Sequence, residues 1–270
     1  MSVVEPLDTV LITGASSGIG ATYADRFAQR GHPLVLVARN VARLEELAAR
    51  LAREYHVKVD VLAADLTAPA GRARVEQRLR DDESIGMLVN NAGVGGGSVL
   101  AQASPDAVQS MIELNVTAPS RLVAALLGRL LARGHGSIIN IASALAIAPE
   151  LFGGAYAASK SYVLTYTLAL HKQVAEHGLR VQCVLPGVVR TEIWDQIGGL
   201  DAIPAQMIME VDEMVDAALA GYDQGEVITI PSLPDIEEWN RFDEARRRMA
   251  PELSRNVAAD RYKSDIPEDA

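Results

Sequence analysis

Tyr156 and Lys160 are spaced four residues apart in a stretch with helical periodicity. Residues i and i+4 share one face of a helix, so we expect the phenol and the ammonium to be neighbours. An isolated tyrosine has a pKa of about 10, and a nearby positive charge favours its phenolate. The pair therefore has the chemistry of a general acid for a carbonyl oxygen, or of a general base for an alcohol. The same spacing is common on plain helix surfaces, so other residues have to support this interpretation.

Two further polar residues are expected near this pair. Ser143 follows the apolar stretch 138–142, which is typical of a buried strand. The carboxyl ends of parallel strands form the ligand crevice of a sheet, where a hydroxyl can hydrogen-bond a substrate oxygen. Asn115 precedes Pro119 by four residues, and proline has no N–H for the carbonyl of residue i−4. We therefore expect the Asn115 carbonyl to be free to hold a water. The alternative is that Asn115 is an ordinary polar residue of a helix.

A glycine-rich loop follows the first apolar stretch, residues 10–12. Gly14, Gly18 and Gly20 have the spacing Gly-x3-Gly-x-Gly and lead into a helical pattern. Glycines allow a tight turn and a close approach of the backbone to a pyrophosphate, and the N–H groups of a helix N-terminus favour an anion. At the first strand-to-helix turn, the motif predicts a dinucleotide site rather than a plain turn.

The end of the second apolar stretch, residues 34–37, bears on which dinucleotide binds. An acidic residue there would hold the ribose 2′-hydroxyl of NAD, whereas an arginine accommodates the 2′-phosphate of NADP. The stretch is followed by Arg39 and Asn40, with no Asp or Glu at its end. Because a guanidinium can bond a phosphate bidentately, the sequence predicts NADP. The alternative is that Arg39 is merely an exposed residue at a helix start, with Asn40 as the N-cap.

Short apolar stretches rich in β-branched residues alternate with helical segments across residues 7–230. They are 10–12, 34–37, 57–62, 87–89, 138–141, 181–185 and 227–230. This alternation predicts an α/β fold with a single Rossmann-type, doubly wound parallel sheet of seven strands and helices on both faces. We place this domain at residues 1–232. Residues 233–270 are expected to be a charged C-terminal extension with one helix at 236–249, either a solvated tail or a segment that packs on the body or on a partner subunit.

The composition excludes several classes of protein. Of the 270 residues, 49% are hydrophobic and 22% are charged, as in globular proteins. The net charge of −10 disfavours nucleic acids and anionic membranes as partners. A single cysteine, Cys183, leaves no internal disulfide and no cysteine-based zinc site, and we expect no metal. Because we find neither a long apolar run nor a basic leader, we expect no membrane contact and a cytoplasmic location.

In their order and spacing, these motifs resemble the short-chain dehydrogenase/reductase family over residues 7–230. The motifs that carry the resemblance are Thr13-Gly14-x3-Gly18-x-Gly20, Asn90-Asn91-Ala92-Gly93, Asn115, Ser143, Tyr156-x3-Lys160 and Pro186-Gly187 followed by Thr191. The resemblance implies a catalytic tetrad of Asn115, Ser143, Tyr156 and Lys160. We expect the cofactor to contact Gly14, Ser16, Ser17, Gly18, Ile19, Gly20, Arg39, Asn40, Asp65, Leu66, Asn91, Ala92, Gly93, Tyr156, Lys160, Pro186, Gly187, Val189 and Thr191.

The resemblance also implies a reaction. NADPH would deliver a hydride to a carbonyl carbon, while Ser143 polarises the carbonyl oxygen and Tyr156 protonates it. Lys160 would lower the pKa of Tyr156, and a water on Asn115 would relay the replacement proton. We therefore expect an NADPH-dependent oxidoreductase that interconverts a ketone or aldehyde and an alcohol. The alternatives are another enzyme on the same scaffold, such as a 3-oxoacyl reductase, and a non-enzymatic NADP-binding redox sensor, which would be expected to lack Tyr156 or Lys160.

The loops after the fifth and sixth strands are expected to form the substrate side. Their apolar residues favour a hydrophobic ketone or alcohol, unless they only pack the loops onto the body: Leu145, Ile147, Leu151, Phe152, Ile193, Trp194, Ile197, Met207 and Met209. The second loop is interrupted at Gly198 and Gly199, and we interpret it as a mobile lid. We interpret Glu150 and Glu192, which also lie in these loops, as solvated charges.

Two long apolar segments, residues 106–132 and 156–177, bear on assembly. One face of each is expected to pack on the sheet. The resemblance implies that the opposite faces form an interface, and thus a homodimer or homotetramer. In this chain a charged extension replaces the short C-terminus that often helps to form the tetramer in the family.

Overall fold

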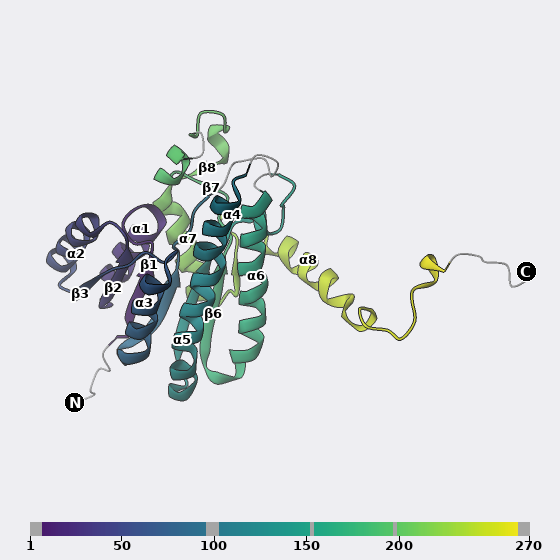
Figure 1. The fold of residues 1–270 in the computed structure, drawn as a ribbon, viewed down its shortest axis with the longest axis horizontal. Helices are drawn as coiled ribbons and strands as arrows, with labels where there is room; N and C mark the ends of the chain where they lie inside the picture. Colours follow the sequence, from purple (N-terminus) through teal and green to yellow (C-terminus); the bar gives the residue numbers. More distant parts are fainter. Residues whose placement is uncertain (1–6, 96–102, 152–153, 197–198, 264–270) are drawn as a thin grey trace, which may run out of the picture. The chain divides into compact units, whose positions relative to one another are not determined.

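The computed structural model describes residues 7–95, 103–151, 154–196 and 199–263 (Figure 1). The strands are β1 (Thr9–Thr13), β2 (Leu34–Ala38), β3 (Val59–Ala63), β4 (Ile85–Asn90), β5 (Gly136–Ile141), β6 (Leu179–Val184), β7 (Val188–Val189), β8 (Ile208–Met209) and β9 (Ile228–Thr229). The α-helices are α1 (Gly18–Gln29), α2 (Val41–Tyr55), α3 (Pro69–Asp81), α4 (Pro105–Ile112), α5 (Ala118–Arg133), α6 (Gly154–Val174), α7 (Val211–Gln224) and α8 (Ile236–Arg248).

Seven of these strands form one parallel sheet in the order β3-β2-β1-β4-β5-β6-β9. The chain begins at the central strand β1, where Val10 lies beside Leu34 of β2 on one side and Met87 of β4 on the other. It builds outward to β3 and then returns to the other side of β1 with β4. The strand order therefore reverses between β1 and β4, and a ligand crevice is expected outside the carboxyl ends of these two strands.

The side chains of each strand enter two separate cores. Val10 and Ile12 of β1 pack in a core with residues of α1, α2 and α7. Leu11, which points to the opposite face because side chains alternate along a strand, packs in a core with residues of α3, α5 and α6. Strands that are buried on both faces read as continuous apolar runs rather than as alternating patterns. The seven-stranded, doubly wound sheet with helices on both faces is therefore confirmed.

The helical pattern of the sequence predicts a regular helix at Asn115, but the structure does not have one there. A π-helical turn, Glu113–Thr117, joins α4 to α5 and contains this residue. Pro119 cannot donate to the carbonyl of Asn115, so a regular ladder of i→i−4 hydrogen bonds cannot pass this point. A π-turn absorbs such an interruption, and π-turns are frequent at functional sites.

The segment after β6 is more ordered than a plain loop. It contributes β7 and β8, which pair in parallel as a separate two-stranded sheet, with Val188 beside Ile208 and Val189 beside Met209. Met209 also packs against the core that includes α1 and α7. Packing onto the body, the alternative left open for the apolar residues of this loop, therefore holds for Met209. Strands this short carry no period-two signal, which is why the sequence did not predict them.

The chain divides into two compact units, residues 1–232 and residues 233–270. The second unit contains α8, close to the helix expected at 236–249. Asp235 caps this helix by accepting a hydrogen bond from the Glu237 backbone N–H at 2.9 Å. Within the helix, Asp243 pairs with Arg246 at 2.6 Å and with Arg247 at 3.0 Å. Local capping and ion pairs of this kind stabilise a helix with a highly charged sequence.

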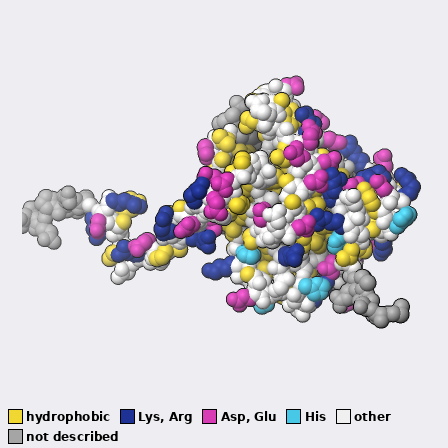
Figure 2. All heavy atoms as spheres, turned by 180° about the vertical axis from the view of Figure 1, so that it is seen from behind, with side chains coloured by type: hydrophobic (Ala, Val, Ile, Leu, Met, Phe, Trp, Pro, Cys, Tyr) yellow, Lys and Arg dark blue, Asp and Glu magenta, His cyan; other side chains and the backbone are white. Residues whose placement is uncertain are grey.

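Acidic and basic side chains are interspersed over the face seen in Figure 2. Among the helices that the structure describes, none has the length and apolarity that a membrane crossing requires. The described residues also contain no group of three His, Cys, Asp or Glu side chains placed to hold a metal ion. Cys183 is a buried free thiol.

Candidate active site

The loop after β1 is fixed to the end of β4 by hydrogen bonds of the Thr13 hydroxyl and the Asn91 side chain. The hydroxyl of Thr13 accepts from the backbone N–H groups of Asn91 and Ala92, each at 3.0 Å. The side-chain amide of Asn91 donates to the carbonyls of Thr13 at 2.9 Å and Gly14 at 3.2 Å. These bonds hold the loop at the reversal point of the sheet. Thr13 has no role of its own among the sequence predictions, although a hydroxyl at the last strand position before a glycine loop is a recognisable signal.

The glycines of this loop are required by its geometry. Gly14 and Gly18 have φ values of +66° and +52°, which side chains rarely adopt. A Cβ on Gly14 would lie 2.8 Å from the Asn91 amide nitrogen, and one on Gly20 would lie 2.3 Å from the Gly14 carbonyl oxygen. The loop therefore presents bare backbone at the start of α1, as a pyrophosphate site needs.

Gly20→Ala should weaken NADPH binding, because the new methyl group would lie 2.3 Å from the Gly14 oxygen and 2.5 Å from the Asn91 amide nitrogen. Overpacking of this kind costs about 1–3 kcal/mol, and it would displace the loop that forms the site. Fluorescence titration with NADPH checks the affinity. Gly128→Ala is the matched control, since a Cβ at Gly128 meets no atom of the described residues within 4 Å. If Gly20→Ala bound NADPH as tightly as the control, the tight packing of this loop would not matter.

Ser143, Tyr156 and Lys160 line one pocket together with the glycine loop. Ser143 follows β5 and caps a short 3-10 turn, Ala144–Ala146, by accepting a hydrogen bond from the Leu145 N–H at 3.2 Å. Tyr156 and Lys160 lie in the first turns of α6, where the Lys160 nitrogen is 5.8 Å from the centre of the Tyr156 ring. The expected i,i+4 neighbours are therefore on one face, directed at the same pocket as the serine.

Lys160 is a buried ammonium. Its Nζ donates a hydrogen bond to the Ile141 carbonyl at 2.9 Å, and its side chain is almost inaccessible. Burial disfavours the charged form and lowers the pKa of Lys160 from 10.5 to about 8. At neutral pH the amine still carries most of its charge, and that charge lies beside the pocket.

The electrostatics of Tyr156 differ from the expectation. Burial raises the pKa of Tyr156, and a hydrogen bond with Ser143 opposes this rise. The expected lowering by Lys160 does not emerge in the free protein, because the ammonium is bonded to the Ile141 carbonyl and the phenolate would be poorly solvated. The phenol is thus protonated at neutral pH, the form that a general acid needs.

The side chain of Asn115 does not line the pocket, but its hydrogen bonds link three segments of the chain. Its oxygen accepts from the Val94 N–H at 3.0 Å, and its nitrogen donates to the Val94 carbonyl at 3.1 Å and to the Ser159 hydroxyl at 3.0 Å. Ser159 in turn donates to the Tyr156 carbonyl at 2.7 Å. These bonds join the π-turn, the loop after β4 and the start of α6. Ser159 was missed by the sequence analysis, because a serine next to a lysine on a helix carries no distinctive signal.

The pocket brings together most of the expected site residues. Those that line it are Gly14, Ser17, Gly18, Ile19, Asn91, Gly93, Ser143, Tyr156, Lys160, Pro186, Gly187, Val189 and Thr191. The expected residues that do not line it are Ser16, Gly20, Arg39, Asn40, Asp65, Leu66, Ala92 and Asn115. Of these, Gly20 lies against the Gly14 carbonyl, and Leu66 packs in the core. The lining also includes Ile141, Ala142, Glu192, Ile193 and Trp194.

Three of the residues expected to contact the cofactor, Arg39, Asn40 and Asp65, follow β2 and β3. The Asp65 carboxylate accepts from the hydroxyl and N–H of Thr67 at 2.7 and 2.9 Å, and these bonds hold its pKa below the usual range. Asn40 is the N-cap of α2 and accepts from the Arg43 N–H at 3.1 Å. The capping alternative is therefore correct for Asn40. Arg39 is exposed, and its positive charge helps to lower the pKa of Asp65.

The substrate side is formed in part by the segment after β6. Ile193 and Trp194 line the pocket, and the Trp194 indole donates to the Val189 carbonyl at 2.8 Å. Leu151 is 74% exposed and Met207 is 60% exposed. Two other residues expected on this side, Phe152 and Ile197, lie outside the described residues.

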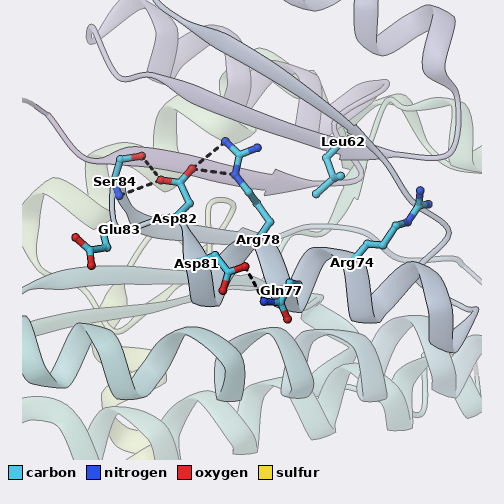
Figure 3. A pocket seen from close by; sticks show the side chains of 8 residues that line it. All are labelled: Leu62, Arg74, Gln77, Arg78, Asp81, Asp82, Glu83 and Ser84. Carbon is cyan, nitrogen blue, oxygen red and sulfur yellow. Dashed lines mark hydrogen bonds and ion pairs between the residues drawn. The ribbon is translucent and has the colours of Figure 1, made fainter.

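A second hollow lies beside α3 (Figure 3). Of its charged side chains, Arg78 pairs with Asp82 at 2.8 Å, and it also pairs with Asp60 of β3 at 2.6 Å. Asp82 also accepts from the Ser84 hydroxyl at 2.7 Å. Arg78 and Asp82 therefore satisfy each other, and the lining of this hollow contains none of the residues expected at the active site.

Comparison with known proteins finds the same fold in solved structures. A short-chain dehydrogenase from Sphingobium yanoikuyae, solved in complex with NADPH, is 48% identical, with a TM-score of 0.93 over 95% of this chain and 100% of that one. The bulky-bulky ketone specific alcohol dehydrogenase from Comamonas testosteroni is 46% identical, with a TM-score of 0.88 over 95% of this chain and 98% of that one. A very-long-chain 3-oxoacyl-CoA reductase-like protein from Arabidopsis thaliana is 28% identical over 78% of this chain and 68% of its own length.

The family model for short chain dehydrogenases matches residues 8–199. This range contains the glycine loop, the Asn115 turn and the pair of Tyr156 and Lys160. The chain therefore belongs to the short-chain dehydrogenase/reductase family of oxidoreductases, which act on alcohol and carbonyl groups.

Proposed function

We propose that residues 1–232 form an NADPH-dependent carbonyl reductase that interconverts an apolar ketone and its alcohol. The observation that carries this proposal is that one pocket is lined both by the bare glycine loop and by Ser143, Tyr156 and Lys160. The loop suits the phosphates of a dinucleotide, and the three side chains suit proton transfer to a carbonyl oxygen.

The residues present fit a nicotinamide dinucleotide. A Cβ on Gly93 would lie 3.2 Å from the Asn115 side-chain oxygen and 3.4 Å from the Lys160 nitrogen, so this glycine keeps the space beside Lys160 open. Gly14, Ser17 and Gly18 would hold the phosphates, and Thr191 the nicotinamide end. When bound, NADPH supplies a hydride to the carbonyl carbon.

Each catalytic residue has a separate task in this proposal. Tyr156 gives its phenolic proton to the carbonyl oxygen, while the Ser143 hydroxyl donates a hydrogen bond to the same oxygen. The Lys160 ammonium would stabilise the phenolate that remains, would hold the ribose hydroxyls of the bound cofactor, and would pass a replacement proton toward Tyr156. Asn115 holds α6 in place through Ser159, and its backbone carbonyl holds a water in the proton path. In the direction of alcohol oxidation the same groups act in reverse.

The substrate we propose is a ketone with bulky apolar substituents. Ile193 and Trp194 supply apolar walls beside the catalytic groups, and the similar Comamonas enzyme is described as specific for bulky-bulky ketones. The experiment is to follow NADPH consumption with diaryl ketones, small ketones, ketosugars and 3-oxoacyl thioesters. We expect the diaryl ketones to have the highest kcat/KM. A preference for the 3-oxoacyl thioesters would instead favour the alternative that the Arabidopsis relative suggests.

Arg39→Asp should shift the cofactor preference from NADPH toward NADH. The change removes a charge-assisted bond to the 2′-phosphate and adds repulsion, which corresponds to about a tenfold or larger fall in the ratio of the two kcat/KM values. Steady-state kinetics with both cofactors measure this ratio. An unchanged ratio would refute the role of Arg39.

We further propose that the protein is a homodimer, or a homotetramer, in the cytoplasm. Ile112 of α4 and Tyr162 of α6 are 45% and 42% exposed, on the helices for which the family resemblance implies an interface. We propose residues 233–270 as an appendage separate from the catalytic chemistry. Light scattering on the full chain and on a chain ending at residue 232 measures the state of assembly.

A further inference from the structure

Arg43 and Glu192 form an ion pair that the sequence analysis did not foresee. The Arg43 guanidinium lies 2.6 Å from the Glu192 carboxylate, although 148 residues separate them in the chain. Glu192 was interpreted as a solvated charge. It lies instead between Thr191 and Ile193 in the pocket lining, and it is paired with a side chain from α2.

Arg43 and Glu192 both lie next to residues that are expected to contact the cofactor. Arg43 lies in the first turn of α2. Its backbone N–H donates to the side chain of Asn40, the N-cap of the helix, which follows Arg39 in the chain. Glu192 lines the same pocket as Ser17 and Gly18 of the glycine loop. Arg43 is therefore joined to the rim of the pocket through Glu192, and its backbone lies in the helix turn that follows β2, where the 2′-phosphate is expected.

A phosphate can replace the Glu192 carboxylate as the partner of Arg43. The Arg43 and Glu192 side chains are 48% and 57% exposed, and exposed ion pairs are worth little in free energy. A phosphate carries more charge than a carboxylate and has three acceptor oxygens, so it is the stronger partner for a guanidinium.

We propose that Arg43 is a second ligand of the cofactor's 2′-phosphate, and that Glu192 occupies this arginine in the free protein. Glu192 then competes with the 2′-phosphate, and the pair sets the preference for NADPH over NADH together with Arg39. This inference rests on the proposed use of NADPH.

The test measures dissociation constants by calorimetry for adenosine 2′,5′-bisphosphate and for 5′-AMP, which lacks the 2′-phosphate. Arg43→Gln should weaken the bisphosphate about tenfold or more and leave 5′-AMP within about twofold, with partial recovery in Arg43→Lys. Glu192→Gln should tighten the bisphosphate about threefold or more, but only while Arg43 is present. In the double variant the Glu192 change should therefore have no further effect.

Arg50→Gln is the matched control. Arg50 lies on the same helix and pairs with Asp25 and Glu54, away from the pocket lining. It should leave both dissociation constants unchanged. The inference is overturned if Arg43→Gln weakens both ligands equally, or if Glu192→Gln does not tighten the bisphosphate. A wild-type protein that binds NADPH no better than NADH would overturn the proposed cofactor itself, and the inference with it.

Discussion

Tyr156→Phe should lower kcat for ketone reduction by about 10²–10⁴-fold, the usual contribution of a general acid. The phenylalanine ring fills the same space in α6 but has no proton to give to the carbonyl oxygen. Burial already raises the pKa of Tyr156, so the wild-type phenol is in its acid form at neutral pH. NADPH affinity should stay near the wild-type value. Steady-state kinetics and fluorescence titration of the same preparation separate the two effects.

Tyr162→Phe is the control for this prediction. Tyr162 lies on the same helix, and its hydroxyl bonds the Ser120 hydroxyl at 3.0 Å, outside the pocket lining. The control should retain full activity. If Tyr156→Phe retained it too, proton transfer would have to come from another group, and the assignment of the acid would be wrong.

Lys160→Met should abolish reduction and at the same time stabilise the free protein. In the folded state burial lowers the pKa of Lys160 from 10.5 to about 8, so keeping the charge buried costs on the order of 3 kcal/mol at neutral pH. The variant loses the hydrogen bond to the Ile141 carbonyl, a loss of about 1 kcal/mol. The net gain should raise the midpoint of thermal unfolding by about 5 °C.

The gain in stability of Lys160→Met over wild type should become smaller as the pH rises. Below about pH 8 the lysine is protonated in both the folded and the unfolded state, and the cost of burying the charge is fully present. Between pH 8 and 10.5 the folded lysine loses its proton first, so the unfolded state binds more protons and wild-type stability rises with pH. The difference between variant and wild type should therefore shrink from pH 7 to pH 10. Thermal melts at both pH values measure it, and a variant less stable than wild type at pH 7 would show that burial of Lys160 is not costly.

The sheet and much of the site could be predicted from the sequence because their signals are local. Residues 10–12 and 34–37 are apolar runs of strand length, and a strand buried on both faces has no other pattern to show. Tyr156 and Lys160 are neighbours through helix geometry alone. The three glycines of the loop mark backbone that cannot carry side chains.

Features that depend on distant parts of the chain could not be predicted. Arg43 meets Glu192 only because the fold brings α2 beside the segment after β6. The pKa of Tyr156 depends on burial, which the spacing to Lys160 does not encode. Pro119 did signal an interruption at Asn115, but the π-turn and the contact with Ser159 required coordinates.

The most direct test of the proposed reaction is transfer of deuterium from NADPH labelled at nicotinamide C4 to a diaryl ketone, with the two labelled stereoisomers used in turn. We expect the alcohol to carry one deuterium at the former carbonyl carbon with one stereoisomer and none with the other. The Tyr156→Phe variant should form neither product at a comparable rate. An unlabelled alcohol with both stereoisomers, or no alcohol with any ketone of the panel, would contradict hydride transfer at this site.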